Sequence, residues 1–87
     1  MEYWNEKVKR ILKSELVLRG ISNSDLANLL ENIGIEETKS SIDSKISRGT
    51  FSASFLFQCF RVIGCKKIEI KEYDNQFSPT SETRNKK

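Results

Sequence analysis

The feature that most limits what this sequence can fold into is the position of its four glycines, the only ones in the chain. Gly20, Gly34, Gly49 and Gly64 divide the first 64 residues into four short segments. Apolar residues within these segments recur at three- and four-residue spacing, which is typical of a helix with one buried face. Glycine is frequent just past a helix C-terminus, so each of the four is predicted to end a helix. The sequence therefore predicts an all-α fold of four to five short helices.

The first two predicted helices differ in how clearly their starts can be recognised. Residues 2–19 form an amphipathic pattern in which Trp4, Val8 and Leu16 share the apolar face. The second helix runs to residue 33 and starts at a capping box, because Ser22 is followed three residues later by Asp25. These patterns predict helices over residues 2–19 and 22–33.

The third and fourth helices are predicted over residues 35–47 and 52–63. Ile35, Ile42 and Ile46 share one face of the third, and serines dominate the opposite face. Ser52 is a plausible N-cap for the fourth, whose inward residues are mostly aromatic or aliphatic.

The C-terminal part changes character after residue 65. Residues 66–73 alternate between charged and apolar side chains, with Ile68 and Ile70 on one face, which predicts a short C-terminal β-strand. Residues 74–87 are polar and are predicted to be a disordered tail. The predicted organisation is one domain over residues 1–73 and a tail over residues 74–87.

Composition excludes several kinds of active site. A chain of 87 residues has room for one small domain, and it contains no His and two Cys. The lack of His excludes His-based triads and Cys/His zinc fingers, and two Cys cannot close a four-ligand zinc site. No glycine-rich phosphate loop or nucleophile–base motif is present. We therefore expect a binding module that is not an enzyme and that uses no cofactor and no metal.

The sequence also gives no sign of membrane targeting. No apolar run approaches the roughly 18 residues that a membrane span needs. Residues 1–6 lack the basic start of a signal peptide, and no apolar stretch follows them. The expectation is a soluble cytoplasmic protein with no membrane contact.

A capped helix, a turn containing glycine, a second helix with a polar face and an apolar closing helix follow one another over residues 21–64. The matching residues include Ser22, Asp25 and Ala27 in the first of these helices, and Ile46 and Gly49 in the second. This arrangement resembles the lambda-repressor-like, or Xre-type, helix-turn-helix domain. The resemblance implies a DNA-binding module that acts as a transcriptional regulator and as a dimer, and whose recognition helix spans about residues 36–48.

A second resemblance rests on the patterns Trp-x-x-x-Val-Lys-x-Ile-Leu-Lys at residues 4–13 and Lys-Ile-Ser-Arg-Gly-Thr-Phe at residues 45–51. The region from residue 4 to residue 64 is similar to a family of small bacterial domains that are functionally uncharacterised. This resemblance is the more specific of the two, but it implies little about function.

The candidate DNA-contacting residues lie mainly on the third predicted helix. Small side chains on its outer face would let the backbone approach a major groove, and Ser can hydrogen-bond to base edges or phosphates. Residues at the N-terminus of the preceding helix can bind a phosphate through free N–H groups. The candidates are Asn23, Ser24, Lys39, Ser40, Ser41, Ser44, Lys45, Ser47, Arg48 and Thr50.

Charge leaves a second interpretation open. The chain carries a net charge of only +3, and the charges over residues 35–50 sum to zero because Glu36, Glu37 and Asp43 offset three cations. The two glutamates would also repel phosphates. The alternative is a protein-interaction or antitoxin-like adaptor on the same fold. In the DNA-binding interpretation Ile68 and Ile70 could pair two copies by strand addition. A serine face is also common as a plain solvated helix surface.

Overall fold

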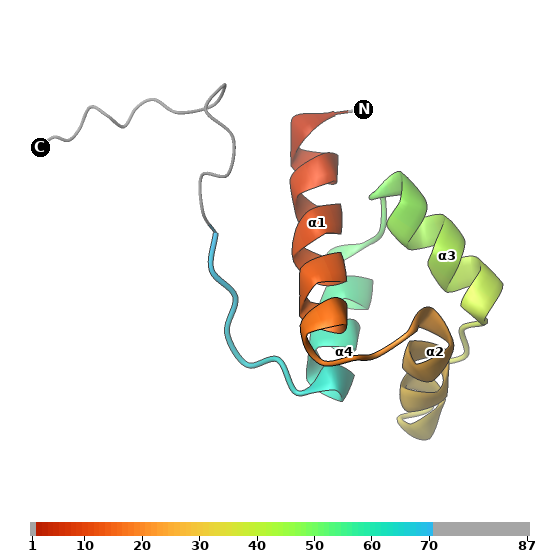
Figure 1. The fold of residues 1–87 in the computed structure, drawn as a ribbon. Coiled ribbons are helices and arrows are strands. Elements are labelled where there is room, and N and C mark those ends of the chain that lie inside the picture. Colours follow the sequence, from red (N-terminus) through yellow and green to blue (C-terminus); the bar gives the residue numbers. More distant parts are fainter. Residues whose placement is uncertain (1, 71–87) are drawn as a thin grey trace, which may run out of the picture.

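A computed structural model describes residues 2–70, which form four helices. Figure 1 shows the first helix standing beside the fourth, with the second and third to one side of them. The helices are α1 (Tyr3–Leu18), α2 (Asn23–Asn32), α3 (Lys39–Arg48) and α4 (Ala53–Ile63). The all-α prediction is confirmed for this part of the chain, and α1, α2 and α4 lie within one residue of their predicted bounds.

Side chains at the N-caps explain where the helices begin. Ser22 accepts a hydrogen bond from the Asp25 N–H, and the Asp25 carboxylate accepts one from the Ser22 N–H, as the capping box predicted. The Ser52 hydroxyl accepts from the Phe55 N–H at the start of α4. These bonds satisfy backbone donors that the helix itself leaves unpaired.

The predicted start of the third helix is wrong by four residues. α3 begins at Lys39, not at residue 35, because Thr38 is in an extended conformation and caps it. The Thr38 hydroxyl accepts from the Ser41 N–H at 3.0 Å, and the Ser41 hydroxyl accepts from the Thr38 N–H at 3.1 Å. Ile35 is half-buried and packs against the core from the connection between α2 and α3. Glu36 and Glu37 therefore precede the helix.

The strand predicted over residues 66–73 has no counterpart where it can be observed. Residues 66–70 lack regular secondary structure, and residues 71–73 lie outside the described residues. A single strand is not stable by itself, and the described chain provides no second strand for pairing. The predicted tail, residues 74–87, also lies outside the described part.

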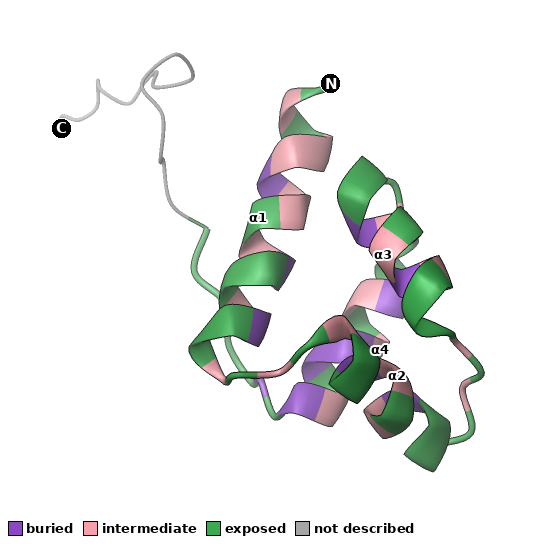
Figure 2. Ribbon diagram, turned by 45° about the vertical axis from the view of Figure 1, so that its right-hand side comes forward, coloured by how far each residue is buried: buried purple, intermediate pink, exposed green. Residues whose placement is uncertain are grey.

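The core is formed by one face of each helix, and the purple residues in Figure 2 lie on the inner sides of the helices. α2 packs against α3 and α4, and α1 packs against the same two helices. The Cys59 side chain is fully buried in this core. The buried hydrophobic residues are Leu12, Leu16, Leu26, Leu30, Ile42, Ile46, Phe55, Cys59, Phe60, Ile63 and Cys65.

The C-terminus of α3 lies directly against α1. Gly49 ends α3 with a φ of +68°, and a Cβ atom placed on it would lie 2.6 Å from the Asn5 carbonyl oxygen. Lys9 of α1 donates a hydrogen bond through Nζ to the Ser47 carbonyl oxygen at 3.1 Å. The absence of a side chain at Gly49 and this hydrogen bond allow the end of α3 to lie close to α1.

Candidate nucleic-acid interface

The outer face of α3 carries a row of small polar side chains. Ser40, Ser44 and Ser47 are exposed and follow one another at four- and three-residue spacing, so they lie on the same face. Arg48 is exposed at the end of this row, where it also suits the C-terminal dipole of the helix. Within residues 2–70, these four side chains form no hydrogen bond or ion pair. Their polar groups are free to bind a ligand.

Two other candidates, Asn23 and Lys39, bind the Asp43 carboxylate of α3. Asn23 donates through Nδ2 to Asp43 Oδ1 at 2.7 Å, and Lys39 donates through Nζ to Asp43 Oδ2 at 2.7 Å. The hydrogen bonds from Lys39 and Asn23 keep the pKa of Asp43 below its ordinary value. Asn23 therefore helps to hold α2 and α3 together, and the charge of Lys39 is offset by its partner.

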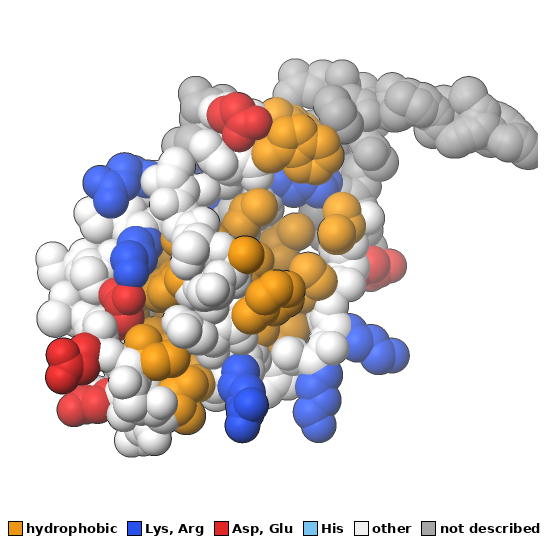
Figure 3. All heavy atoms as spheres, turned by 180° about the vertical axis from the view of Figure 1, so that it is seen from behind, with side chains coloured by type: hydrophobic (Ala, Val, Ile, Leu, Met, Phe, Trp, Pro, Cys, Tyr) orange, Lys and Arg blue, Asp and Glu red, His pale blue; other side chains and the backbone are white. Residues whose placement is uncertain are grey.

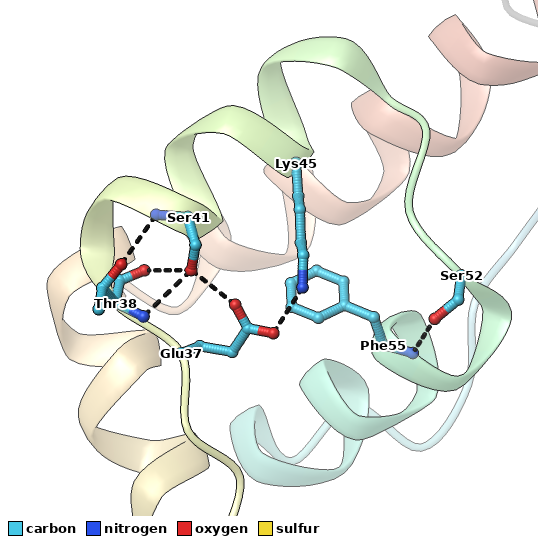
Figure 4. A network of polar contacts seen from close by, with 6 residues as sticks. All are labelled: Glu37, Thr38, Ser41, Lys45, Ser52 and Phe55. Atoms are coloured by element: carbon cyan, nitrogen blue, oxygen red, sulfur yellow. Dashed lines mark hydrogen bonds and ion pairs between the residues drawn. The ribbon is translucent and has the colours of Figure 1, made fainter.

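A second network, shown in Figure 4, ties α3 to the connection before it. Ser41 donates through its hydroxyl to Glu37 Oε1 at 2.6 Å, and Lys45 Nζ lies 2.5 Å from Glu37 Oε2. The Lys45 Nζ atom also lies 4.7 Å from the centroid of the Phe55 ring, within the range of a cation–π contact.

The environment of this network favours a charged pair. Partial burial acts to raise the pKa of Glu37, but the hydrogen bonds from Lys45 and Ser41 and the charge of Lys45 outweigh it, so the pKa lies below its usual value. The Glu37 side chain is 12% exposed and that of Lys45 is 35% exposed. Lys45 therefore serves the fold, and DNA could recruit it only by competing with Glu37.

The ten predicted contact residues thus divide into two groups. Asn23, Lys39, Ser41 and Lys45 have side-chain partners inside the protein. The remaining side chains are exposed and have no polar partner among the described residues; they are Ser24, Ser40, Ser44, Ser47, Arg48 and Thr50.

Two residues near this face, Thr38 and Lys9, were not among the functional residues predicted from the sequence. Thr38 could have been recognised, because Thr three residues before Ser41 resembles a capping box. Lys9 gives no such signal, because the backbone carbonyl that it binds lies 38 residues further along the chain.

Neither cysteine is placed for chemistry. Both are free and buried. Burial, with a smaller effect from the negative charge of Glu37, raises the pKa of Cys59 to about 12. Burial and the neighbouring Glu15 carboxylate also raise the pKa of Cys65. Both thiols are thus poor nucleophiles near neutral pH.

Residues 2–70 contain neither a metal-binding cluster nor a membrane-spanning helix. No group of three or more His, Cys, Asp or Glu in residues 2–70 could hold a metal ion. No helix there has the length and apolar character needed to cross a membrane.

A comparison with protein families gave one match. Residues 4–68 match the family model described as a domain of unknown function, DUF6471. The chain belongs to the DUF6471 family. Neither the curated proteins nor the solved structures contain a match to it.

The Lys-Ile-Ser-Arg-Gly-Thr-Phe segment of this DUF6471 domain is explained largely by packing. Lys45 pairs with Glu37, Ile46 is buried, and Gly49 lies against the α1 backbone. The ring of Phe51 packs on that of Phe55 with a centroid separation of 5.5 Å. Ser47, Arg48 and Thr50 are the members of the segment with exposed polar side chains, so any ligand-binding role of the segment falls to them.

Proposed function

We propose that this DUF6471 domain is a helix-turn-helix module that binds duplex DNA, with α3 in the major groove and transcriptional regulation as its role. The observation that carries the proposal is the row formed by Ser40, Ser44, Ser47 and Arg48. These side chains are exposed, have no polar partner in the described chain, and three of them are small. A helix with a small, polar outer face can approach base edges closely in a groove about 12 Å wide.

Charge supports a particular division of roles within this interface. The cations Lys39 and Lys45 are offset by Asp43 and Glu37, whereas Arg48 has no ion-pair partner in the described chain. Arg48 is thus the α3 side chain best suited to bind guanine through two hydrogen bonds or to bind a phosphate. Ser24 in the first turn of α2 and Thr50 just after α3 are exposed and complete the proposed contacts.

Dimerisation belongs to the same proposal, because one short helix buries little surface and repressor-type sites are commonly paired half-sites. In this proposal Ile68 and Ile70 pair two copies by strand addition: residues 66–70 form no strand in the single chain, and the strand would form on pairing.

The test is a selection of bound duplexes from a random DNA pool, followed by affinity measurements on the selected duplex at several salt concentrations. Arg48→Ala should weaken binding by about tenfold or more if Arg48 reads a base, and should reduce the salt slope by about 1 if it binds a phosphate. The matched control is Arg61→Ala, which removes an exposed arginine from α4. Absence of salt-sensitive binding to any duplex, or equal losses in the two variants, would contradict the proposal.

A protein-interaction or antitoxin-like adaptor is the second candidate. The specific observation in its favour is exposed apolar surface: the side chains of Val17 and Leu18 at the end of α1 are each 78% exposed. Apolar residues gathered on a surface often mark a protein interface. Stoichiometric co-purification of a protein, lost in Leu18→Ser and retained in Arg48→Ala, would favour this candidate over DNA binding.

A further inference from the structure

A shallow groove lies where the chain leaves α4, on a part of the domain that the DNA proposal does not use. It has a volume of about 260 Å³, and its walls include Phe57, Phe60, Arg61, Lys66, Lys67 and Ile68. Figure 3 shows hydrophobic side chains gathered on the face of the molecule opposite to the view of Figure 1. Phe57 is the most exposed aromatic side chain in the described chain, at 68%.

The wall formed by residues 65–67 is held in place by its own contacts. The Cys65 N–H donates to the Phe60 carbonyl oxygen at 2.9 Å, and the Cys65 thiol donates to the Lys67 carbonyl oxygen at 3.3 Å. The groove is therefore defined by bonded backbone on one side and by α4 on the other.

The chemistry of the groove points to an acidic, aromatic occupant. Arg61, Lys66 and Lys67 are exposed at its rim, and none of the three forms an ion pair with the described residues. Its apolar floor suits a ring, and its volume is below the roughly 300 Å³ typical of the smallest pockets for small-molecule ligands. A groove of this size and charge suits one or two side chains of a peptide that also carries carboxylates.

A second copy of the chain is a poor occupant. Pairing this face with itself around a two-fold axis would bring the three cations of each copy into one interface. Such like-charge contacts across an interface are unfavourable.

The chain itself supplies a segment of the required chemistry a few residues further on. Residues 72–77 read Glu-Tyr-Asp-Asn-Gln-Phe, and so combine two carboxylates with two aromatic rings. Four residues separate Ile68, at the end of the groove, from Tyr73. Connections of two to five residues are enough to reverse a chain direction, so the segment can reach the groove. A tether this short also gives a high effective concentration.

We propose that the groove beside α4 binds residues 72–77 of the same chain, with an aromatic ring of the segment against Phe57 and its carboxylates facing Arg61, Lys66 and Lys67. This inference does not depend on DNA binding. It predicts that the segment shields Phe57 and neutralises a cationic part of the surface.

The experiment is NMR spectroscopy on the full-length, isotope-labelled chain. We expect nuclear Overhauser effects between the Phe57 ring and the ring of Tyr73 or Phe77. In the Phe57→Ser variant, the amide chemical shifts of residues 72–77 should move to the values measured for a free synthetic peptide of residues 71–87. They should move in the same direction in Lys66→Glu. The matched control, Leu18→Ser, removes another strongly exposed apolar side chain, outside the groove, and should leave these shifts unchanged.

Three results would overturn the proposal. The first is that the shifts of residues 72–77 equal those of the free peptide in the unmodified chain. The second is that they change on dilution, which would mean binding between molecules. The third is that Phe57→Ser weakens duplex binding without moving these shifts, which would assign the groove to nucleic acid. Because DNA affinity is measured separately, failure of this proposal and failure of the DNA proposal are distinguishable.

Discussion

At the scale of single residues, Gly49 is under two constraints, and the other helix-ending glycines share only the first of them. Its φ of +68° favours glycine, and a Cβ atom would lie 2.6 Å from the Asn5 carbonyl oxygen, a backbone atom that cannot rotate away. We predict that Gly49→Ala lowers the free energy of unfolding by about 2–3 kcal/mol, from the conformational penalty plus displacement of α1. Urea denaturation would measure this loss.

Gly20 offers a matched control. Its φ is +66°, nearly the same as that of Gly49, but a Cβ atom there would have no neighbour within 4 Å. Gly20→Ala should therefore show the conformational penalty alone, about 1 kcal/mol. Equal losses in the two variants would mean that the contact with α1 contributes nothing.

Lys45 provides a test that separates a folding role from a DNA-contacting role. Lys45→Met should lower the free energy of unfolding by about 1–2 kcal/mol, because it leaves a mostly buried Glu37 without its partner and removes the contact with the Phe55 ring. Lys39→Met breaks a more exposed pair and should cost less than about 0.5 kcal/mol. Thermal or urea unfolding without DNA distinguishes them, and an unchanged stability in Lys45→Met would return Lys45 to the DNA-contacting set.

At the scale of elements, the start of α3 is the clearest difference between expectation and structure. A start at Lys39 and a start at residue 35 predict stability changes of opposite sign for one substitution. With Thr38 as N-cap, Thr38→Ala should cost about 1 kcal/mol of stability. If the helix began at residue 35, Thr38 would be in its interior, where Ala is the better helix former and the change would stabilise. The sign of the shift in unfolding midpoint decides between them.

The reasons for this error and for the correct assignments are physical. The helix starts at Ser22 and Ser52 depend on hydrogen bonds between residues three positions apart. Such bonds can be predicted from the spacing of residues in the sequence. Ile35 satisfies the helical period of Ile42, but an apolar residue in a connection can fill the same part of the core. Periodicity alone does not separate the two cases.

In the candidate interface, too, the features set by local spacing could be predicted, and those that depend on packing could not. The exposed serine row follows from helical geometry once Ile42 and Ile46 are assigned to the core, so sequence reasoning placed it correctly. The Lys39–Asp43 pair has the four-residue spacing of a helical ion pair and could have been expected. The Lys45–Glu37 pair could not, because Glu37 precedes the helix and its position depends on how the connection packs.

At the scale of the whole molecule, we expect chemical labelling of the two thiols to measure two different unfolding events, one global and one local. Cys59 is fully buried in the core, whereas Cys65 is held at the end of α4 by the Phe60 and Lys67 carbonyl oxygens. In a Cys65→Ala variant, labelling of Cys59 should require global unfolding and give the same free energy as urea denaturation.

In a Cys59→Ala variant, labelling of Cys65 should be faster, since releasing residues 64–67 from α4 leaves the rest of the core in place. The measurement is the rate of thiol modification under native conditions, corrected for the stability lost in each variant. Identical labelling rates for both cysteines would mean that the domain opens only as one unit.

The contact between Gly49 and Asn5 has a consequence for how DUF6471 sequences can diverge. The atom that Gly49 approaches is a main-chain carbonyl oxygen, which every amino acid possesses. Position 5 should therefore tolerate many side chains, while position 49 should remain glycine in every relative that keeps α1 against α3. In a relative with another residue at position 49, the first helix should lie further from the end of the third helix.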